Sequence, residues 1–201
     1  DDALTVIDKK VTWNTQKCIN CDTCIEICPN YSSPKVTEMT VDEVTERVAN
    51  NIPFIRGITV SGGECSLYLP FLRELFSKCK SLGITCLMDC NGTIPIWNDS
   101  VLEVCDGVML DVKAWSSKKF EDLTGTDNRV VIENLRQLSH TNKLEEIRIV
   151  CLDKYVDAED TIKGIAASVS QQTREKVLLK LIKFRNFGVK GELEGVESPS
   201  Q

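Results

Sequence analysis

The strongest constraint on the fold is an alternation of helix-like and strand-like stretches that runs through most of the chain. Five stretches have the character of buried strands: 57–60, 84–88, 107–110, 146–152 and 177–184. Strands that alternate with helices form βα units, and the right-handed crossovers of such units make the strands parallel. The sequence therefore predicts one α/β domain, which is either barrel-like or an open doubly wound sheet.

Local signals mark the ends of the helices between these strands. Thr40 and Glu43 have the spacing of a capping box at the start of the first helix. Pro70 and Gly83 bound the second helix, and Asp157 is expected to cap the last one. Two further helices are expected at 116–125 and 130–138.

Ahead of the α/β pattern lies a run of four cysteines, Cys18, Cys21, Cys24 and Cys28, of which the last precedes Pro29. This is the spacing of bacterial ferredoxin ligands to a [4Fe–4S] cluster. The alternatives are zinc, which usually takes two pairs with a longer spacer, and disulfides, which belong mainly to small secreted chains. The fourth cysteine of such a run can also serve a second cluster, so the role of Cys28 stays open.

These patterns divide the chain into three expected parts. Residues 1–36 form a ferredoxin-like cluster-binding insert with little core of its own, which starts with a small hairpin at 4–7 and 11–13. Residues 37–190 form the α/β domain, and residues 191–201 form a polar tail.

Composition limits the location and the partners of the protein. The 201 residues carry a net charge of −6 and have no block of consecutive basic residues, which argues against a nucleic-acid partner. No apolar run approaches the length of a membrane span and the start is not a signal peptide, so no membrane partner is expected. Reduced cysteines in this number, ten in all, indicate the cytoplasm. The first residue is Asp1 rather than Met, from which we expect a fragment or a processed start.

Polar groups follow the carboxyl ends of the expected strands, where parallel α/β folds place their active sites. The groups at these ends are Gly62, Gly63, Glu64, Asp89, Asn91, Asp111, Lys113 and Arg185. Turn formation alone accounts for any one of them, and Asp89 could simply cap a turn. It accounts less well for a double glycine that lets backbone approach a ligand, or for Arg148 inside an apolar strand. We therefore expect a ligand site at this rim, with an anionic partner for Arg148.

Three segments make the pattern more specific: Thr-Val-Ser-Gly-Gly-Glu at 59–64, Asp-Cys-Asn-Gly at 89–92 and Met-Leu-Asp-Val-Lys at 109–113. With the cysteine run and the ending at 183–191, they resemble the radical S-adenosylmethionine (SAM) activating enzymes of glycyl radical enzymes. The chain is similar to pyruvate formate-lyase activating enzymes over nearly its whole length. The resemblance implies a partial TIM-type (β/α)6 barrel with a ferredoxin-like [4Fe–4S] insert near the amino terminus.

The resemblance also implies a function. It indicates an oxidoreductase that cleaves SAM reductively to a 5′-deoxyadenosyl radical, which abstracts hydrogen from a glycine of a partner enzyme. The implied partners are that glycyl radical enzyme and a flavodoxin or ferredoxin as reductant. The implied cofactors are a [4Fe–4S] cluster, SAM and a monovalent cation. The alternative is an iron–sulfur electron-transfer or binding module on a catalytically inert α/β scaffold.

The family motifs assign roles to single residues. The implied SAM-binding residues are Gly62, Gly63, Glu64, Asn91, Asp111, Lys113 and Arg185. Glu64 and the glycine backbone suit the ammonium of SAM. The implied catalytic residues are Lys113 and Arg148, and either Lys113 or Arg148 suits the carboxylate of SAM. Asp111 is expected to form a salt bridge with Lys113. The implied metal ligands are Cys18, Cys21, Cys24 and Cys28 for the cluster, and Asp89 and Asp111 for the cation.

The sequence departs from the family pattern at two places. The Cys-x-x-x-Cys-x-x-Cys motif that binds the catalytic cluster does not occur in it, so either the start is missing or the activity has been lost. The last strand leads to Arg185 where related enzymes have His, and the sole histidine, His140, is expected on a helix surface. The six cysteines outside the run are expected to be packing residues, although Cys65 and Cys90 lie at the rim.

Overall fold

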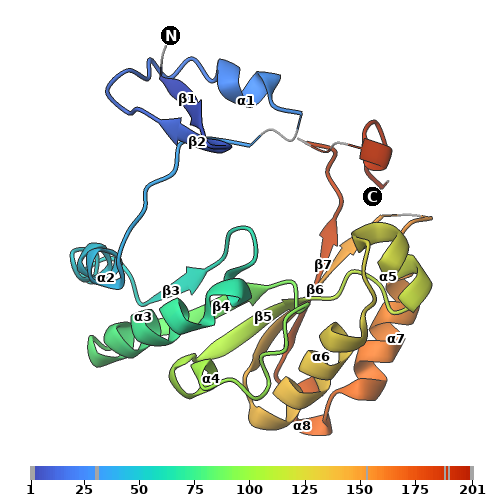
Figure 1. Ribbon diagram of the computed structural model, residues 1–201. Coiled ribbons are helices and arrows are strands. Elements are labelled where there is room, and N and C mark those ends of the chain that lie inside the picture. Colours follow the sequence, from blue (N-terminus) through green and yellow to red (C-terminus); the bar gives the residue numbers. More distant parts are fainter. Residues whose placement is uncertain (1–2, 30–31, 153, 188, 190, 200–201) are drawn as a thin grey trace. The chain divides into compact units, whose positions relative to one another are not determined.

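The computed structural model describes residues 3–29, 32–152, 154–187, 189 and 191–199 (Figure 1). The chain divides into two compact units. The first consists of Asp1–Met39 and Arg185–Glu197, and the second of Thr40–Phe184 and Ser198–Gln201. The three parts expected from the sequence stay a prediction.

The first unit contains the small hairpin that the sequence predicts. Strand β1 (Leu4–Ile7) pairs with β2 (Lys10–Trp13) in antiparallel register. The two residues between them, Asp8 and Lys9, both have positive φ angles, as a type I′ hairpin turn requires. The unit also contains helix α1 (Thr23–Ile27) and the 3-10 helix η2 (Gly191–Leu193).

The second unit is built on one sheet of five parallel strands in sequence order. The strands are β3 (Gly57–Val60), β4 (Thr85–Cys90), β5 (Gly107–Asp111), β6 (Leu144–Cys151) and β7 (Leu178–Lys183). The five predicted strands are thus confirmed. The sheet is open, as in a partial barrel, and holds five of the six expected strands within the described residues.

Helices connect the strands as the alternation predicts. They are α2 (Val41–Ala49), α3 (Leu69–Ser81), α4 (Val101–Val104), α5 (Ser117–Thr124), α6 (Arg129–Thr141), α7 (Ala158–Ser168) and α8 (Gln171–Arg174), with the 3-10 helix η1 (Cys65–Tyr68) before α3. The capping box of Thr40 and Glu43 is confirmed at the start of α2, and Gly125 ends α5 with a φ of 76°. The short helices α1, α4, α8 and η1 were not predicted. No helix in the described part of the chain has both the length and the apolar character needed to cross a membrane.

The two faces of the sheet differ in chemistry, because successive side chains of a strand point to opposite faces. One face is apolar and is packed against α3, α6 and α7 (Figure 1). Its fully buried side chains are Cys86, Met88, Val108, Leu110, Ile147 and Ile149. The other face carries Asp89, Met109, Asp111, Glu146 and Arg148. Parallel sheets usually read as apolar on both faces, so a face with this many charges indicates a functional surface.

A register shift between β5 and β6 decides which residues of β6 lie on the charged face. Val108 pairs with Leu144, whereas the next residue, Met109, pairs with Glu146, so Glu145 is an extra residue in β6. Because side chains alternate with a period of two, Glu146 and every second residue after it would otherwise lie on the buried face. The bulge therefore turns these side chains toward the charged face.

The loop after β5 is held by Asp157, the residue before α7. Its carboxylate accepts hydrogen bonds from the backbone N–H of Trp115 at 3.1 Å, the backbone N–H of Ser116 at 3.0 Å and the hydroxyl of Thr161 at 2.9 Å. Asp157 is the N-cap residue of α7, as predicted, but its side chain makes no hydrogen bond to the N–H groups of that helix. Burial opposes ionisation of Asp157, but the three donors outweigh it and lower its pKa.

Replacing Asp157 with Asn is expected to lower the free energy of unfolding by about 1–3 kcal/mol at neutral pH. The reason is that the NH2 group of Asn would face hydrogen-bond donors that now donate to a carboxylate oxygen. Because the pKa of Asp157 is lower in the folded protein than in the unfolded chain, its carboxylate stabilises the fold at pH values above the unfolded pKa. This contribution is lost as the pH falls below about 4. Urea unfolding of both proteins at neutral and acidic pH measures the difference.

The matched control is Asp160→Asn in the exposed first turn of the same helix. Its effect is expected to be within about 1 kcal/mol, the scale of a helix-dipole contribution. Equal losses for the two variants would show that the loop contacts of Asp157 contribute nothing of their own.

Candidate functional site

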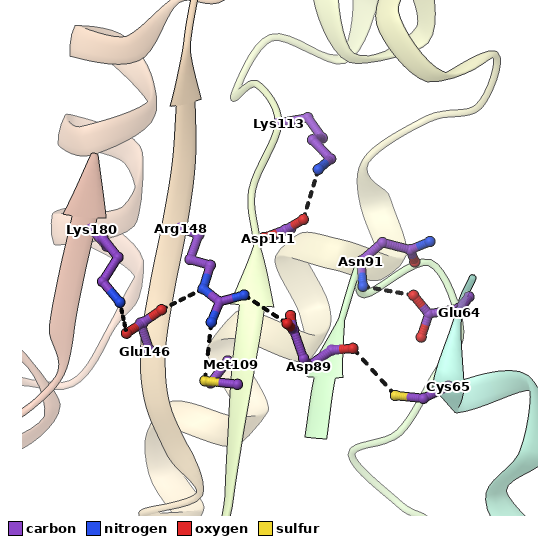
Figure 2. A network of polar contacts seen from close by, with 10 residues as sticks. All are labelled: Glu64, Cys65, Asp89, Asn91, Met109, Asp111, Lys113, Glu146, Arg148 and Lys180. Carbon is purple, nitrogen blue, oxygen red and sulfur yellow. Dashed lines mark hydrogen bonds and ion pairs between the residues drawn. The ribbon is translucent and has the colours of Figure 1, made fainter. Parts of the chain in front are cut away.

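A line of charged side chains crosses the polar face of the sheet from β7 to β4 (Figure 2). Lys180 donates to Oε2 of Glu146 at 2.7 Å, and Nε of Arg148 donates to Oε1 of the same carboxylate. Nη1 of Arg148 donates to Oδ2 of Asp89 at 2.8 Å. The charges alternate in sign along this line, so each charge withdrawn from water lies beside its opposite. The anionic partner expected for Arg148 is therefore confirmed, and there are two of them.

A second ion pair lies at the end of β5. Nζ of Lys113 is 2.7 Å from Oδ2 of Asp111, which confirms the predicted salt bridge. Asp89 and Asp111 thus each have a protein cation, because Arg148 serves the first and Lys113 the second. As long as these two ion pairs are in place, charge balance at the two aspartates does not require an added ion.

Backbone conformation explains why two glycines follow β3. Gly62 and Gly63 have φ angles of 89° and 50°, and a Cβ on either would meet nothing within 4 Å. Glu64 then ties this loop to the end of the next strand. Its carboxylate accepts from the backbone N–H of Ser66 at 2.9 Å and, through the other oxygen, from the backbone N–H of Asn91 at 2.7 Å.

Hydrogen bonds of two asparagine side chains, one in the loop and one on α6, hold the loop after β4 in place. The side chain of Asn91 stabilises the turn that follows, because its Oδ1 accepts from the backbone N–H of Thr93 at 2.9 Å. Asn134, fully buried on α6, donates to the carbonyl of Gly92 at 2.8 Å and accepts from the N–H of Ile96 at 3.0 Å. Sequence reasoning missed Asn134, although an asparagine on the apolar face of a predicted helix was a signal available to it.

The second unit brings together six of the residues that the sequence singles out (Figure 2). They are Glu64, Asp89, Asn91, Asp111, Lys113 and Arg148. Arg185 belongs to the first unit and is not part of this network. Within the ending at 183–191, Gly188 and Lys190 lie outside the described residues. Glu146 and Lys180 were missed, although an acid two residues before Arg148 in a strand shares its face.

In the first unit, three of the four cysteines of the run line one pocket of about 260 Å³. Cys18, Cys21 and Cys24 share it with Trp13 and Lys35, among others. Among the described residues, no three His, Cys, Asp or Glu side chains are already grouped as metal ligands. Binding of a cluster would therefore draw these thiols closer together.

The surroundings of the thiols suit an anionic, sulfur-rich group. The indole N–H of Trp13 is buried and makes no hydrogen bond of normal geometry among the described residues. It lies near enough to Cys18 to be the main cause that lowers the pKa of that thiol, and the Thr23 hydroxyl does the same for Cys21. Thiolates are the form that binds metals, and a buried donor without an acceptor is costly. These residues fit a [4Fe–4S] cluster.

The cysteines at the rim of the second unit have the opposite character. Cys65 and Cys90 are buried, and the Cys65 thiol donates to the backbone carbonyl of Asp89 at 3.3 Å. Burial raises the pKa of Cys65 to about 11 and that of Cys86 to about 12, and it raises the pKa of Cys90 well above its usual range. Protonated thiols are poor metal ligands, which agrees with the expectation that these residues serve packing.

Comparison with known protein families supplies the identity of this arrangement. The model of the radical SAM superfamily matches residues 16–164. The chain belongs to the radical SAM superfamily.

Three relatives within the superfamily show which branch is involved. The chain is 31% identical to the pyruvate formate-lyase-activating enzyme of Staphylococcus epidermidis, over 86% of this chain and 77% of that protein. It is 29% identical to the pyruvate formate-lyase 1-activating enzyme of Escherichia coli K12, over 82% and 72%. It is 30% identical to a Haemophilus influenzae protein whose name describes it as a glycyl-radical enzyme activating enzyme, over 87% and 74%.

A solved structure confirms the fold. A domain of the pyruvate formate-lyase-activating enzyme from Bacteroides vulgatus superposes with a TM-score of 0.55 at 18% identity, covering 72% of this chain and 86% of that domain. The recognition of a radical SAM activating enzyme from sequence is thus confirmed, together with its enzyme class and its α/β fold. Membership implies SAM and a [4Fe–4S] cluster as cofactors. The roles of individual residues, the monovalent cation and the reductant stay predictions.

In the metal-free protein, iodoacetamide near neutral pH is expected to modify Cys18 and Cys21 first, because their thiol pKa values are lowered and neither is buried. Cys65, Cys86 and Cys90 are expected to stay unmodified while the protein is folded. Peptide mass spectrometry over a time course measures the order.

Reconstitution with iron and sulfide is then expected to protect Cys18 and Cys21 from the reagent. Zinc alone is the control for a simple divalent site, and it is expected to protect them without the absorbance of an iron–sulfur cluster. Iron and sulfide that bind without protecting either thiol would place the cluster elsewhere in the protein.

Proposed function

We propose that this chain is a glycyl-radical-enzyme activase, or the SAM-binding and electron-relaying part of one. One electron cleaves SAM to methionine and a 5′-deoxyadenosyl radical, which takes a hydrogen atom from a glycine of the partner enzyme and leaves as 5′-deoxyadenosine. The observation that carries the proposal is the charged face of the parallel sheet in a chain of this family. It presents both signs of charge where a zwitterionic ligand needs them.

We assign the ammonium of SAM to Glu64 and the backbone of Gly62 and Gly63. Positive φ at both glycines and free space beside them allow backbone to approach a ligand closely. We assign the carboxylate of SAM to Lys113 and Arg148, since charge-assisted hydrogen bonds to carboxylates are short and strong. Asn91 is proposed as a further contact to the same ligand, and the role of Arg185, a residue of the first unit, stays a prediction from the family resemblance.

A monovalent cation is proposed at Asp89 and Asp111, because binding of the SAM carboxylate would remove the cations that these two aspartates now have. When the SAM carboxylate takes over the guanidinium of Arg148, Asp89 loses its present partner. When it takes over Lys113, Asp111 loses its own. Two neighbouring carboxylates then need a new positive charge, which a cation between them provides.

The cysteine run is proposed to hold a [4Fe–4S] cluster through Cys18, Cys21, Cys24 and Cys28. A bound cluster of this kind supplies one-electron transfer, here between a flavodoxin or ferredoxin and the SAM site. The contribution of the protein is the set of thiols together with the indole N–H of Trp13, which is positioned to donate to sulfur. Hydrogen bonds to cluster sulfurs are among the factors that set the reduction potential.

A second candidate function is an electron-transfer module on an α/β scaffold that does not cleave SAM. The observation that favours it is the sequence itself, which contains a ferredoxin-type run but no Cys-x-x-x-Cys-x-x-Cys motif. The two candidates differ in whether the charged face binds SAM.

Equilibrium dialysis of the reconstituted protein with labelled SAM is expected to show saturable binding. Lys113→Ala is expected to weaken it by about 1–3 kcal/mol, the scale for losing a hydrogen bond to a charged group. The matched control is Lys118→Ala, a largely exposed lysine on the neighbouring helix α5, which is expected to leave binding unchanged. Absence of saturable binding would favour the electron-transfer module, whereas equally strong binding in all three proteins would place the SAM site elsewhere.

Formation of 5′-deoxyadenosine with dithionite gives an independent check. This chain is expected to form none, because its sequence lacks the three-cysteine motif of the catalytic cluster. The full product of its gene is expected to form it if a Cys-x-x-x-Cys-x-x-Cys segment is encoded ahead of Asp1. Chromatography of the reaction mixture measures the product, and turnover by this chain alone would show that another set of cysteines binds the catalytic cluster.

A further inference from the structure

Glu146 is a buried carboxylate that neither the motifs nor the family resemblance assigns. It is 6% exposed, although it lies on the charged face of β6. Each of its oxygens takes a different cation: Oε1 accepts from Nε of Arg148, and Oε2 accepts from Nζ of Lys180 at 2.7 Å (Figure 2). Burial opposes ionisation of Glu146, but the hydrogen bonds from these two cations outweigh it and lower its pKa. The group is therefore a fixed negative charge at neutral pH.

The contacts of Arg148 show what this charge does. A guanidinium is planar, and a carboxylate that accepts two parallel hydrogen bonds from it must lie along one edge. That edge is either the one that includes Nε or the one formed by Nη1 and Nη2. Glu146 occupies Nε, which leaves the edge formed by Nη1 and Nη2 for a two-pronged contact. At that edge Nη1 donates to Asp89, and Nη2 contacts the neutral sulfur of Met109 at 3.2 Å. An incoming carboxylate would displace one ionic contact and one weak contact.

The backbone supports the same arrangement. The bulge at Glu145 brings both Glu146 and Arg148 to the charged face, since the two residues are separated by one strand period. Lys180 lies directly beside Arg148 in the register of β6 and β7. The line from Lys180 to Asp89 is thus set by strand pairing, and long flexible loops play no part in it.

We infer that Glu146 is a positioning residue: it holds Nε of Arg148 so that the Nη1–Nη2 edge receives the ligand carboxylate, and Lys180 holds Glu146 in turn. This inference rests on the proposed assignment of the SAM carboxylate to Arg148. The competing explanation is that Glu146 only stabilises the fold. Buried ion pairs are often no better for stability than apolar residues of the same volume, so their presence alone does not decide the matter.

The test is a double-mutant cycle on SAM affinity, measured by equilibrium dialysis of the reconstituted protein. Glu146→Gln keeps the shape and removes the charge, and it is expected to weaken SAM binding about tenfold. In an Arg148→Ala background the same substitution is expected to change affinity less than about twofold, because it acts through Arg148. Glu145→Gln, at the exposed neighbouring position of β6, is the matched control and is expected to leave affinity unchanged.

Binding of a second ligand distinguishes a positioning role of Glu146 from a purely structural one. Decarboxylated SAM lacks the group that Arg148 is proposed to receive, so Glu146→Gln is expected to leave its affinity unchanged while it weakens binding of SAM. A merely structural role would reduce both affinities together. If Glu146→Gln does not fold, Lys180→Met replaces it in the cycle. Lys180 has a half-exposed side chain, and its loss is expected to give the same pattern with a smaller, two- to fivefold effect.

The outcomes separate this inference from the proposed function. If Arg148→Ala binds SAM as tightly as the parent, both the proposed carboxylate site and the inference are overturned. If Arg148→Ala weakens binding and Glu146→Gln does not, the inference alone is overturned. Additive losses in the double variant, or equal losses for SAM and its decarboxylated form, also overturn the inference and leave the proposed site standing.

Discussion

The charged face of the sheet depends on a register shift of one residue between β5 and β6. Without it, Glu146 and Arg148 would lie among the fully buried side chains of the opposite face, away from Asp89. The shift is accommodated locally by Gly107. A Cβ at that position would come within 3.0 Å of Cβ of the bulged residue Glu145. The glycine on one strand and the bulge on the next are therefore one structural feature, and the ion network follows from it.

Buried or half-buried polar side chains on the helices, or on the residues just before them, fix the loops at the strand ends. Asn134 on α6 fixes the loop after β4, and Asp157 before α7 fixes the loop after β5. Asn128 adds a bond to the carbonyl of Trp115 at 2.7 Å in the same loop. Each of these groups satisfies backbone donors or acceptors that would otherwise be buried without partners. A site whose loops are fixed in this way can present its charges to a ligand with little reorganisation.

The elements of the fold could be predicted because their signals are local. Period, capping and turn residues lie within a few positions of one another, as in the capping box of Thr40 and Glu43 or the end of α5 at Gly125. Partners from distant parts of the chain could not be predicted in this way. Sequence reasoning expected an anion for Arg148 but could not say which, because its contact with Asp89 joins residues 59 positions apart and depends on the pairing of the strands. It also did not find the partners of the Asp157 side chain, since a loop 41 residues away competes for the carboxylate.

The stability of the first unit has a different physical basis from that of the second. None of its described residues is buried, and several apolar side chains of its hairpin, including Val6, Ile7 and Val11, are exposed. A segment without a core cannot offset the entropy of ordering its chain by apolar burial. Metal binding supplies such a segment with folding free energy, because ligands that are free in the unfolded chain become fixed in the folded one. The indole N–H of Trp13 beside Cys18 follows the same logic, since the proposed cluster would supply a sulfur acceptor for it. Binding of the proposed cluster and folding of this unit would therefore be one equilibrium, whereas the sheet of the second unit is held by its own core.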